Sequence, residues 1–485
     1  MRTPWDSGRA NPRAGVWLAG ALACSLAAPA FAQQGQPTVE QLQKRLESLE
    51  RRLGLSADGE TAGQSEGAGL ADLDQRLRII ERKLELQEED RIAKAKEAPV
   101  VTVNDKGASL KSADGAYEVK IRGLLQGDGR FFTSGEASGT NDTFLLRTAR
   151  PTIEGTLGGW VGFRFTPEFA GDSASIVDAY ADLKFSPAAT VRLGKFTSPV
   201  GLERLQSSSA LSDVERALPS EIAPNRDIGV QLQGDLAQGR IGYAIGVFNG
   251  TVDGRDAITS NPDNEFEYAG RVFFEPFKND AGFWSGLGFG LGASIGDVRG
   301  SGNNFLPRYR TPGQQQFFAY RSAVSAVGTH TRWSPQAYFY RNGFGLLAEY
   351  IEAKQELQVG TTTRYLENTA WQATASYVLT GEDASYRGVV RPSHPFAPGK
   401  GGWGAWELVG RYGELDVDDA TFPLFADPAA SASKAKAWTL GVNWYLTSNL
   451  KLVANYLDTT FEGGAAAGAD REDEKAVFTR LQVAF

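Results

Sequence analysis

The sequence of 485 residues is poor in the residue types that most often build covalent, catalytic or metal sites: it has one cysteine, one methionine and two histidines. The single cysteine, Cys24, excludes a disulfide bond within the chain. His330 and His394 are too few for a zinc site or a catalytic centre built on several histidines, so we expect no metal and no cofactor. The net charge of −8 gives no general attraction for nucleic acid, which we do not expect as a partner.

The chain also lacks an apolar run of the roughly 20 residues that a membrane-spanning helix needs. Its short apolar run, VWLAGALACSLAAPA, follows three arginines and ends at the small-residue site of residues 30–32. This pattern is typical of a secretory signal peptide, so we expect residues 1–32 to be removed and the mature chain to begin at Gln33. Cys24 would leave with the signal; a lipoprotein anchored through Cys24 is the less favoured alternative.

Two segments after the signal have the spacing of coiled coils. Apolar residues recur at alternating steps of three and four over residues 38–53 and again over residues 70–84, with charged residues between them. The Gly-rich residues 54–69 predict a flexible linker, and Pro99 ends the helical region. We expect residues 33–99 to form coiled-coil segments that self-associate, because short lone helices are not stable; a hairpin of the two helices within one chain is the alternative.

From about Tyr117 the pattern changes to stretches of alternating apolar and polar residues, separated by clusters of Gly, Asn, Asp and Pro. The sixteen predicted strands are 117–132, 143–157, 158–169, 176–186, 189–196, 227–236, 239–249, 265–277, 286–298, 328–340, 343–357, 364–379, 403–416, 434–447, 449–461 and 474–485.

A secreted, Gly-rich, all-β chain with this many alternating strands predicts a sixteen-stranded antiparallel transmembrane β-barrel over residues 100–485. In lipid, only a closed barrel satisfies every hydrogen bond of the strands. A soluble, secreted β-sandwich or β-helix is the alternative. Aromatic residues expected in the interfacial girdles are Phe131, Phe132, Tyr338, Tyr340, Trp444 and Tyr445.

The last strand has two distinct faces. Its alternation predicts that Val477, Leu481, Val483 and Phe485 face lipid. Arg480 and Gln482 would then face the lumen. A terminal aromatic residue preceded by alternating apolar residues also resembles the signal read by the outer-membrane assembly machinery.

Several stretches of the barrel region resemble the phosphate-selective porin O and P family of Gram-negative outer membranes. They are FLLRTARPTIEGTL, DAYADLKF, RLGKFTSPVGLERLQSS, ERALP, PNRDIGVQL and YAIGVFNG. The resemblance implies a homotrimeric channel in outer-membrane lipid, with the coiled coil in the periplasm. It further implies that the third extracellular loop, residues 197–226, narrows the pore, and that phosphate, polyphosphate or related anions pass along rows of arginine.

The resemblance also implies site residues. Arg147 and Arg150 stand where the family has an arginine cluster, and a regular strand cannot point both inward at a spacing of three, so a bulge or strand end is needed. Arg204, Arg216 and Arg226 match basic positions of the constricting loop. Further basic residues expected along the anion pathway are Arg122, Lys195 and Arg480, and the acidic residues expected to hold the loop are Glu203 and Glu215.

One departure from the family puts strict phosphate selectivity in doubt: no lysine lies between Phe196 and Phe277, whereas phosphate-specific members are associated with lysine in the narrow region. A general diffusion porin with little anion specificity is therefore one alternative function, and a structural outer-membrane anchor, which the coiled coil would support, is the other. An enzyme is not expected. The hydrolase-like string at residues 292–296, GASIG, continues the alternation of one strand and lacks the turn and helix that this motif needs.

Overall fold

The computed structural model describes residues 40, 41, 44, 45, 48, 70–133, 141–171, 173–388 and 390–485. Contacts divide the chain into two units, Met1–Lys96 and Glu97–Phe485, and each is described by itself. The predicted signal peptide, the linker and most of the first helical segment lie outside the described residues.

The first unit contains the helix α2, Leu70–Glu97, where the heptad spacing predicts one. Leu77 and Ile80 are buried, and Arg45 Nη2 lies 3.4 Å from Glu81 Oε1. This ion pair joins the two helical segments within one chain, as in the hairpin alternative, and self-association stays a prediction. Among the described residues, no helix combines the length and apolar character needed to cross a membrane.

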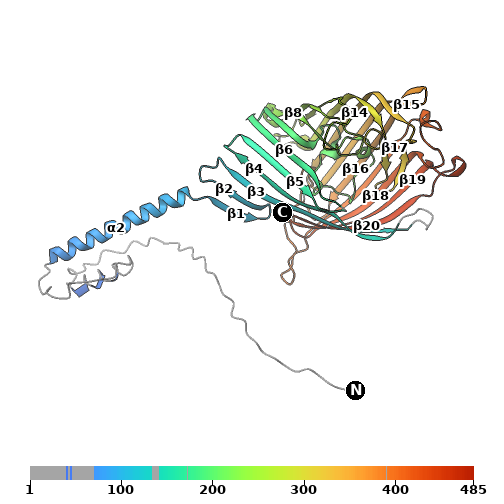
Figure 1. The fold of residues 1–485 in the computed structure, drawn as a ribbon. Helices are drawn as coiled ribbons and strands as arrows, with labels where there is room; N and C mark the ends of the chain where they lie inside the picture. The colour runs from blue at the N-terminus through green and yellow to red at the C-terminus, as the bar shows by residue number, and fades with distance from the viewer. Residues whose placement is uncertain are drawn as a thin grey trace, which may run out of the picture. The chain divides into compact units, whose positions relative to one another are not determined.

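In the second unit, the described residues form an antiparallel sheet of eighteen strands, of which sixteen close into a barrel because β20 pairs with β3 (Figure 1). The barrel strands are β3 (Glu118–Phe132), β4 (Thr143–Leu157), β5 (Val161–Glu168), β6 (Ser175–Ser186), β7 (Ala189–Thr197), β8 (Arg226–Leu236), β9 (Ile241–Phe248), β10 (Glu267–Phe274), β11 (Leu287–Ser301), β14 (Ser325–Arg341), β15 (Phe344–Val359), β16 (Thr362–Val378), β17 (Ala405–Asp416), β18 (Ala432–Tyr445), β19 (Leu450–Gly463) and β20 (Glu474–Ala484). Each corresponds to one predicted strand, so the sixteen-stranded barrel is confirmed.

Two hairpins were not predicted. β1 (Val100–Asn104) and β2 (Gly107–Lys111) precede the barrel, and β2 pairs with the start of β3, next to the place where Phe485 exchanges backbone hydrogen bonds with Gly123. β12 (Arg308–Arg310) and β13 (Gln316–Ala319) lie between β11 and β14. The short 3-10 helices are η2 (Ala237–Gly239), η3 (Phe283–Gly286), η4 (Asp419–Thr421) and η5 (Ala466–Gly468).

A row of Trp and Tyr side chains lies at one level on the outer face of β14 to β19. Cross-strand partners Tyr350 and Trp371, and Tyr412 and Trp438, are directly opposite each other. The row consists of Trp333, Tyr350, Trp371, Tyr412, Trp438 and Tyr456. Such a row is the interfacial girdle of a membrane barrel.

The expected girdle residues were mostly wrong. Tyr338 and Tyr445 are buried inside the barrel, Tyr340 is on the same face as Tyr338, and Phe132 packs on Phe478 in the interior. The reason is the period of two. It places only one of two adjacent aromatic residues outside, as for Trp444 and Tyr445, and it places Tyr338 and Tyr340 together on the inner face, opposite to Trp333 and Phe339.

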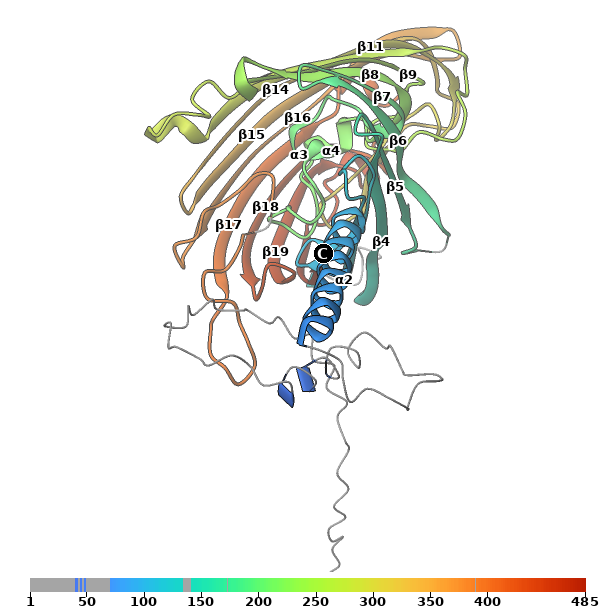
Figure 2. The ribbon, with the colours of Figure 1, turned by 90° about the vertical axis from the view of Figure 1, so that its left-hand side faces the viewer.

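The connection between β7 and β8, residues 198–225, is the third on its side of the barrel and contains the short helices α3 (Leu202–Leu205) and α4 (Pro219–Ile222). Figure 2 shows both helices inside the ring of strands. α4 packs against β15, β16 and β17, on the opposite wall from β7 and β8. We call residues 198–225 the constriction loop.

Candidate functional site

The constriction loop is bound along about half of the barrel wall, from β14 round through β20 to β3 and β4. Buried polar backbone needs partners, and here the wall side chains supply them. Gln336 donates to the Val200 carbonyl, Lys451 donates to the Leu211 carbonyl at 2.7 Å, and Asn455 accepts from the Val214 amide at 2.7 Å. Other wall side chains that bond the loop backbone are Gln126, Glu349, Arg411, Asn443, Arg480 and Gln482, and Thr439 donates to the Asp213 side chain of the loop.

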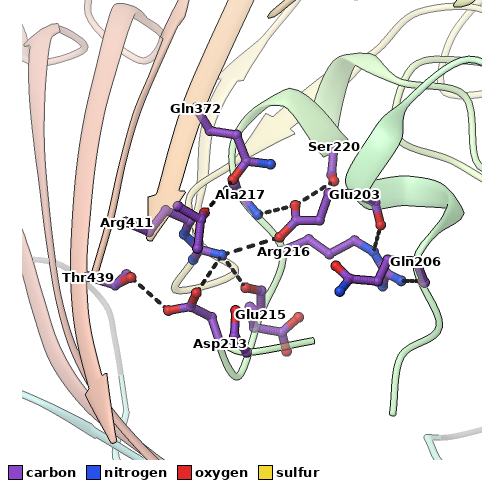
Figure 3. Close-up of polar contacts among 12 residues, drawn as sticks. Glu203, Gln206, Asp213, Glu215, Arg216, Ala217, Ser220, Gln372, Arg411 and Thr439 are labelled. Carbon is purple, nitrogen blue, oxygen red and sulfur yellow. Dashed lines mark hydrogen bonds and ion pairs between the residues drawn. The ribbon is translucent and has the colours of Figure 1, made fainter. Parts of the chain in front are cut away.

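Glu203 connects two parts of the loop to the wall (Figure 3). Its carboxylate accepts from the Ala217 amide at 2.8 Å and from the Ser220 hydroxyl at 3.1 Å. Arg411 of β17 lies 3.5 Å from Glu203 and 3.4 Å from Asp213. A single guanidinium thereby holds two carboxylates that are ten positions apart in the loop.

Glu215 is held by three arginines of the wall. Arg130 and Arg147 donate to it at 2.5 Å and 2.7 Å, and Arg480 lies at 3.7 Å while also binding both oxygens of Asp128. Burial alone would raise the pKa of Glu215, but the charges of Arg147, Arg480 and Arg130 outweigh it and hold the pKa well below its ordinary value. The carboxylate therefore stays charged and fixes the loop.

The predicted irregularity at the arginine cluster is present. The register between β3 and β4 shifts at Gln126 and Gly127, which leaves Arg147 as the extra residue of a β-bulge. The bulge turns both Arg147 and Arg150 to the inside, toward Glu215 and Glu168 respectively.

On the other side of the constriction loop, a lumen cavity of about 820 Å³ runs along β3 to β10. Among its described lining residues, nine are basic: Lys106, Arg122, Arg150, Arg164, Arg192, Arg204, Arg226, Arg271 and Arg391. Three are acidic: Asp105, Asp178 and Asp235. Ser207, Ser208 and Ser209 line the cavity from the loop.

Carboxylates of the wall hold most of these guanidinium groups in place. Arg150 donates to Glu168 at 2.5 Å and to the Ser208 hydroxyl at 3.2 Å. Arg226 lies 3.5 Å from Asp178. Because Glu168 does not line the cavity, Arg150 presents its charge to the lumen.

The same arrangement recurs on the neighbouring strands. Arg122 and Arg164 share Glu154, at 2.9 Å and 2.5 Å, and Arg192 binds Asp182 through two bonds of 2.7 Å and 2.9 Å. Neither Glu154 nor Asp182 lines the cavity. Bidentate pairs of this kind fix the orientation of a guanidinium.

The eight basic residues singled out from the sequence divide into three groups. Arg122, Arg150, Arg204 and Arg226 line the cavity, whereas Arg147, Arg216 and Arg480 bind the constriction loop. Arg216 donates to the carbonyls of Glu203 and Gln206, and burial, with the nearby charge of Arg204, lowers the pKa of Arg216 to about 9.

Lys195 does not belong to the lumen. It shares its face of β7 with Leu193, which is 43% exposed on the outside, while Arg192 and Phe196 on the other face line the cavity. The expectation for Lys195 was therefore wrong, because the alternation places it one residue out of phase.

Four arginines that line the cavity were not singled out from the sequence: Arg164, Arg192, Arg271 and Arg391. Arg164 lies between Phe163 and Phe165, and Arg192 lies between Val191 and Leu193. An arginine with an apolar residue on either side in a barrel strand is expected to point inward, so the alternation itself was the available signal.

A closed barrel with an aromatic girdle on its outer face and a loop folded into its lumen has the architecture of an outer-membrane porin. The chain belongs to the phosphate-selective porin O and P family, whose sequence model matches residues 119–485. Porin O of Pseudomonas aeruginosa is 24% identical in an alignment of 428 residues that covers 80% of this chain and 93% of that protein.

A solved structure shares the fold. The outer membrane channel DcaP of Acinetobacter baumannii is similar with a TM-score of 0.50 at 14% identity, over 77% of this chain and 99% of that chain. The anion-selective porin of Comamonas acidovorans is similar with a TM-score of 0.48 at 15% identity, over 76% of this chain and 100% of that chain. The family supports a channel of the Gram-negative outer membrane rather than an enzyme, and residues 292–296 lie within the continuous strand β11.

Proposed function

We propose that the protein is a water-filled, anion-selective channel for the passive uptake of phosphate, polyphosphate or similar anions. The observation that carries the proposal is the lining of the lumen cavity, in which nine of the described residues are basic and three are acidic. Cations are repelled from such a surface and anions are concentrated at it.

Arginine suits this role because a guanidinium stays charged at physiological pH and offers forked donors to the oxygens of an anion. An anion that enters beside the constriction loop meets Arg226, Arg204 and Arg150, the last of which also donates to the Ser208 hydroxyl. Each site replaces part of the hydration shell and binds weakly enough to pass the ion on. The wall carboxylates moderate that strength, since each guanidinium they hold already has one partner.

Reversal potentials in a potassium chloride gradient across a planar bilayer test the proposal. We expect the current to be carried mainly by chloride, and phosphate and pyrophosphate to block it. A current carried by potassium would contradict the proposal, and a potential near zero would support the general diffusion porin instead.

We also propose that the protein is a homotrimer and that residues 33–99 form its periplasmic coiled coil. The heptad spacing of both helical segments supports self-association. Deleting residues 38–92 tests this part separately: we expect conductance to persist, and the trimer to be weakened in cross-linking experiments.

The terminal aromatic Phe485 supports recognition by the outer-membrane assembly machinery, and removing it should lower the amount of folded barrel.

A further inference from the structure

The end of the constriction loop that leads into Arg226 is bound by a second loop, residues 249–266, which connects β9 to β10. Three backbone hydrogen bonds join the two loops. They run from the Gly254 amide to the Ala223 carbonyl at 3.0 Å, from the Asn225 amide to the Arg255 carbonyl at 3.1 Å, and from the Ala257 amide to the Arg226 carbonyl at 2.7 Å. We call residues 249–257 the bracing segment.

The bracing segment fixes the backbone of Arg226, whose side chain lines the lumen cavity. Asp256 accepts from the Arg226 amide at 3.2 Å, while the Arg226 carbonyl accepts from Ala257. The side chain itself is held less tightly, because its ion pair with Asp178 is long, at 3.5 Å, and its other partner is the side-chain oxygen of the neighbouring Asn225. The position of the guanidinium in the cavity therefore depends on the backbone that carries it.

Gly254 allows the bracing segment to approach the constriction loop this closely. Its φ of +68° lies in the left-handed region, and a Cβ at this position would lie 2.8 Å from the carbonyl oxygen of Glu221 in the constriction loop. A residue with a side chain would be strained there and would push the two backbones apart. The contact between the loops is thus made backbone to backbone.

A buried arginine of β14 anchors the bracing segment. Arg332 donates to Asp253 at 2.7 Å and to the Thr251 carbonyl at 2.7 Å, and its third nitrogen binds Glu267 of β10 at 2.9 Å and 3.0 Å. The other oxygen of Asp253 accepts from the Tyr309 hydroxyl at 3.0 Å. The side chains of Arg332 and Asp253 are 0% and 2% exposed, and neither of these two residues lines the lumen cavity.

We infer that Arg332 and Asp253 are positioning residues for the anion pathway: they hold the bracing segment, which in turn holds Arg226 beside the lumen cavity. The inference rests on the proposed anion channel and adds residues that no passing anion touches. A guanidinium binds an anion well only when its forked donors face it, so a displaced Arg226 binds more weakly although its charge remains.

Block of the chloride current by phosphate, measured on the full-length protein in planar bilayers at pH 7, tests the inference. We expect Arg332→Gln to raise the half-blocking phosphate concentration about tenfold, the effect of losing one charge-assisted hydrogen bond to the anion, and Arg226→Gln to do the same. Added to Arg226→Gln, the substitution Arg332→Gln should change block by less than about twofold, because residues that act through one another are not additive. Arg299→Gln, in an exposed ion pair with Glu265, is the matched control and should leave block unchanged.

Asp256→Ala tests the same route without altering a buried group, because Asp256 is exposed and contacts the Arg226 amide. Loss of one such hydrogen bond should raise the half-blocking concentration about threefold.

Unchanged block in Arg332→Gln, with a folded barrel, would overturn the inference, and so would a tenfold loss on top of that of Arg226→Gln. If Arg332→Gln does not fold, Asp256→Ala decides: weaker block supports the inference and unchanged block overturns it. A potassium-selective current, or no block of the unaltered protein by phosphate, would instead refute the proposed function.

Discussion

The arginines on the two sides of the constriction loop differ in exposure, with Arg147 as the exception, because its side chain is 36% exposed although it binds Glu215 of the loop. The side chains of Arg411, Arg480 and Arg130, which hold the loop, are 4%, 4% and 7% exposed. Those of Arg150, Arg192 and Arg164, which line the cavity, are 17%, 21% and 36% exposed. Both groups are paired with carboxylates, so pairing does not separate them. Whether the loop covers an arginine decides whether it binds the protein or meets a passing ion.

The largest effect is expected from a substitution that breaks the ion pairs between the constriction loop and the wall. Glu215→Gln removes the charge that Arg130, Arg147 and Arg480 share and leaves these three guanidinium groups with Asp128, and removing one partner of a buried ion cluster costs about 3–5 kcal/mol. We expect the constriction loop to detach from this part of the wall, so that single-channel conductance rises and ion selectivity falls.

The control for this experiment is Glu265→Gln, which removes a carboxylate that pairs with the exposed Arg299 at the rim. An unchanged conductance in Glu215→Gln, with a normally folded barrel, would show that the loop does not depend on this ion cluster.

A smaller and different effect is expected from replacing an arginine that lines the lumen cavity. Arg150→Gln removes a lumen charge and leaves Glu168 without its arginine, so the anion-to-cation permeability ratio should fall about tenfold while the loop stays bound. Reversal potentials measure the ratio. Arg147→Gln, three residues away, is the matched comparison: it should raise conductance more than it changes selectivity, because Arg147 binds Glu215. Equal changes in conductance and in selectivity in the two variants would show that the loop-binding and the cavity-lining arginines do not have separate roles.

The smallest effect is expected from replacing a basic residue that neither binds the constriction loop nor lines the lumen cavity. Lys195→Gln should change neither conductance nor reversal potential, because Lys195 shares the outward face of Leu193 and donates to the Ala257 carbonyl. A loss of anion selectivity in this variant, measured in the same gradient, would mean that Lys195 does reach the lumen.

The barrel was predictable because its signal is local. Residues such as Leu291 and Ile295 alternate with small residues along β11, and lipid on one side and lumen on the other require that period of two in every strand. The bulge at Arg147 was predictable for the same reason, since two inward arginines three residues apart violate the period. The hairpin β1–β2 was missed because its five-residue strands are too short for alternation to be recognised.

The partners of the arginines were not predictable from sequence. Glu203 and Glu215 lie in the same loop. Glu203 is held by Arg411 of β17, whereas the arginines that hold Glu215 come from β3, β4 and β20. Arg204 and Arg216 are also loop arginines of similar context, but only Arg204 lines the cavity. Resemblance to the family indicated which residues matter without separating these roles.

The sequence by itself determined that the chain closes into a barrel and which residues of each strand face inward, because alternation is a property of neighbouring residues. Only the tertiary structure decided which inward charges line the open passage, because the constriction loop covers one half of the wall and leaves the other half free. That choice depends on contacts such as Arg480 with the Val214 carbonyl, which join residues far apart in the chain and leave no pattern within either segment.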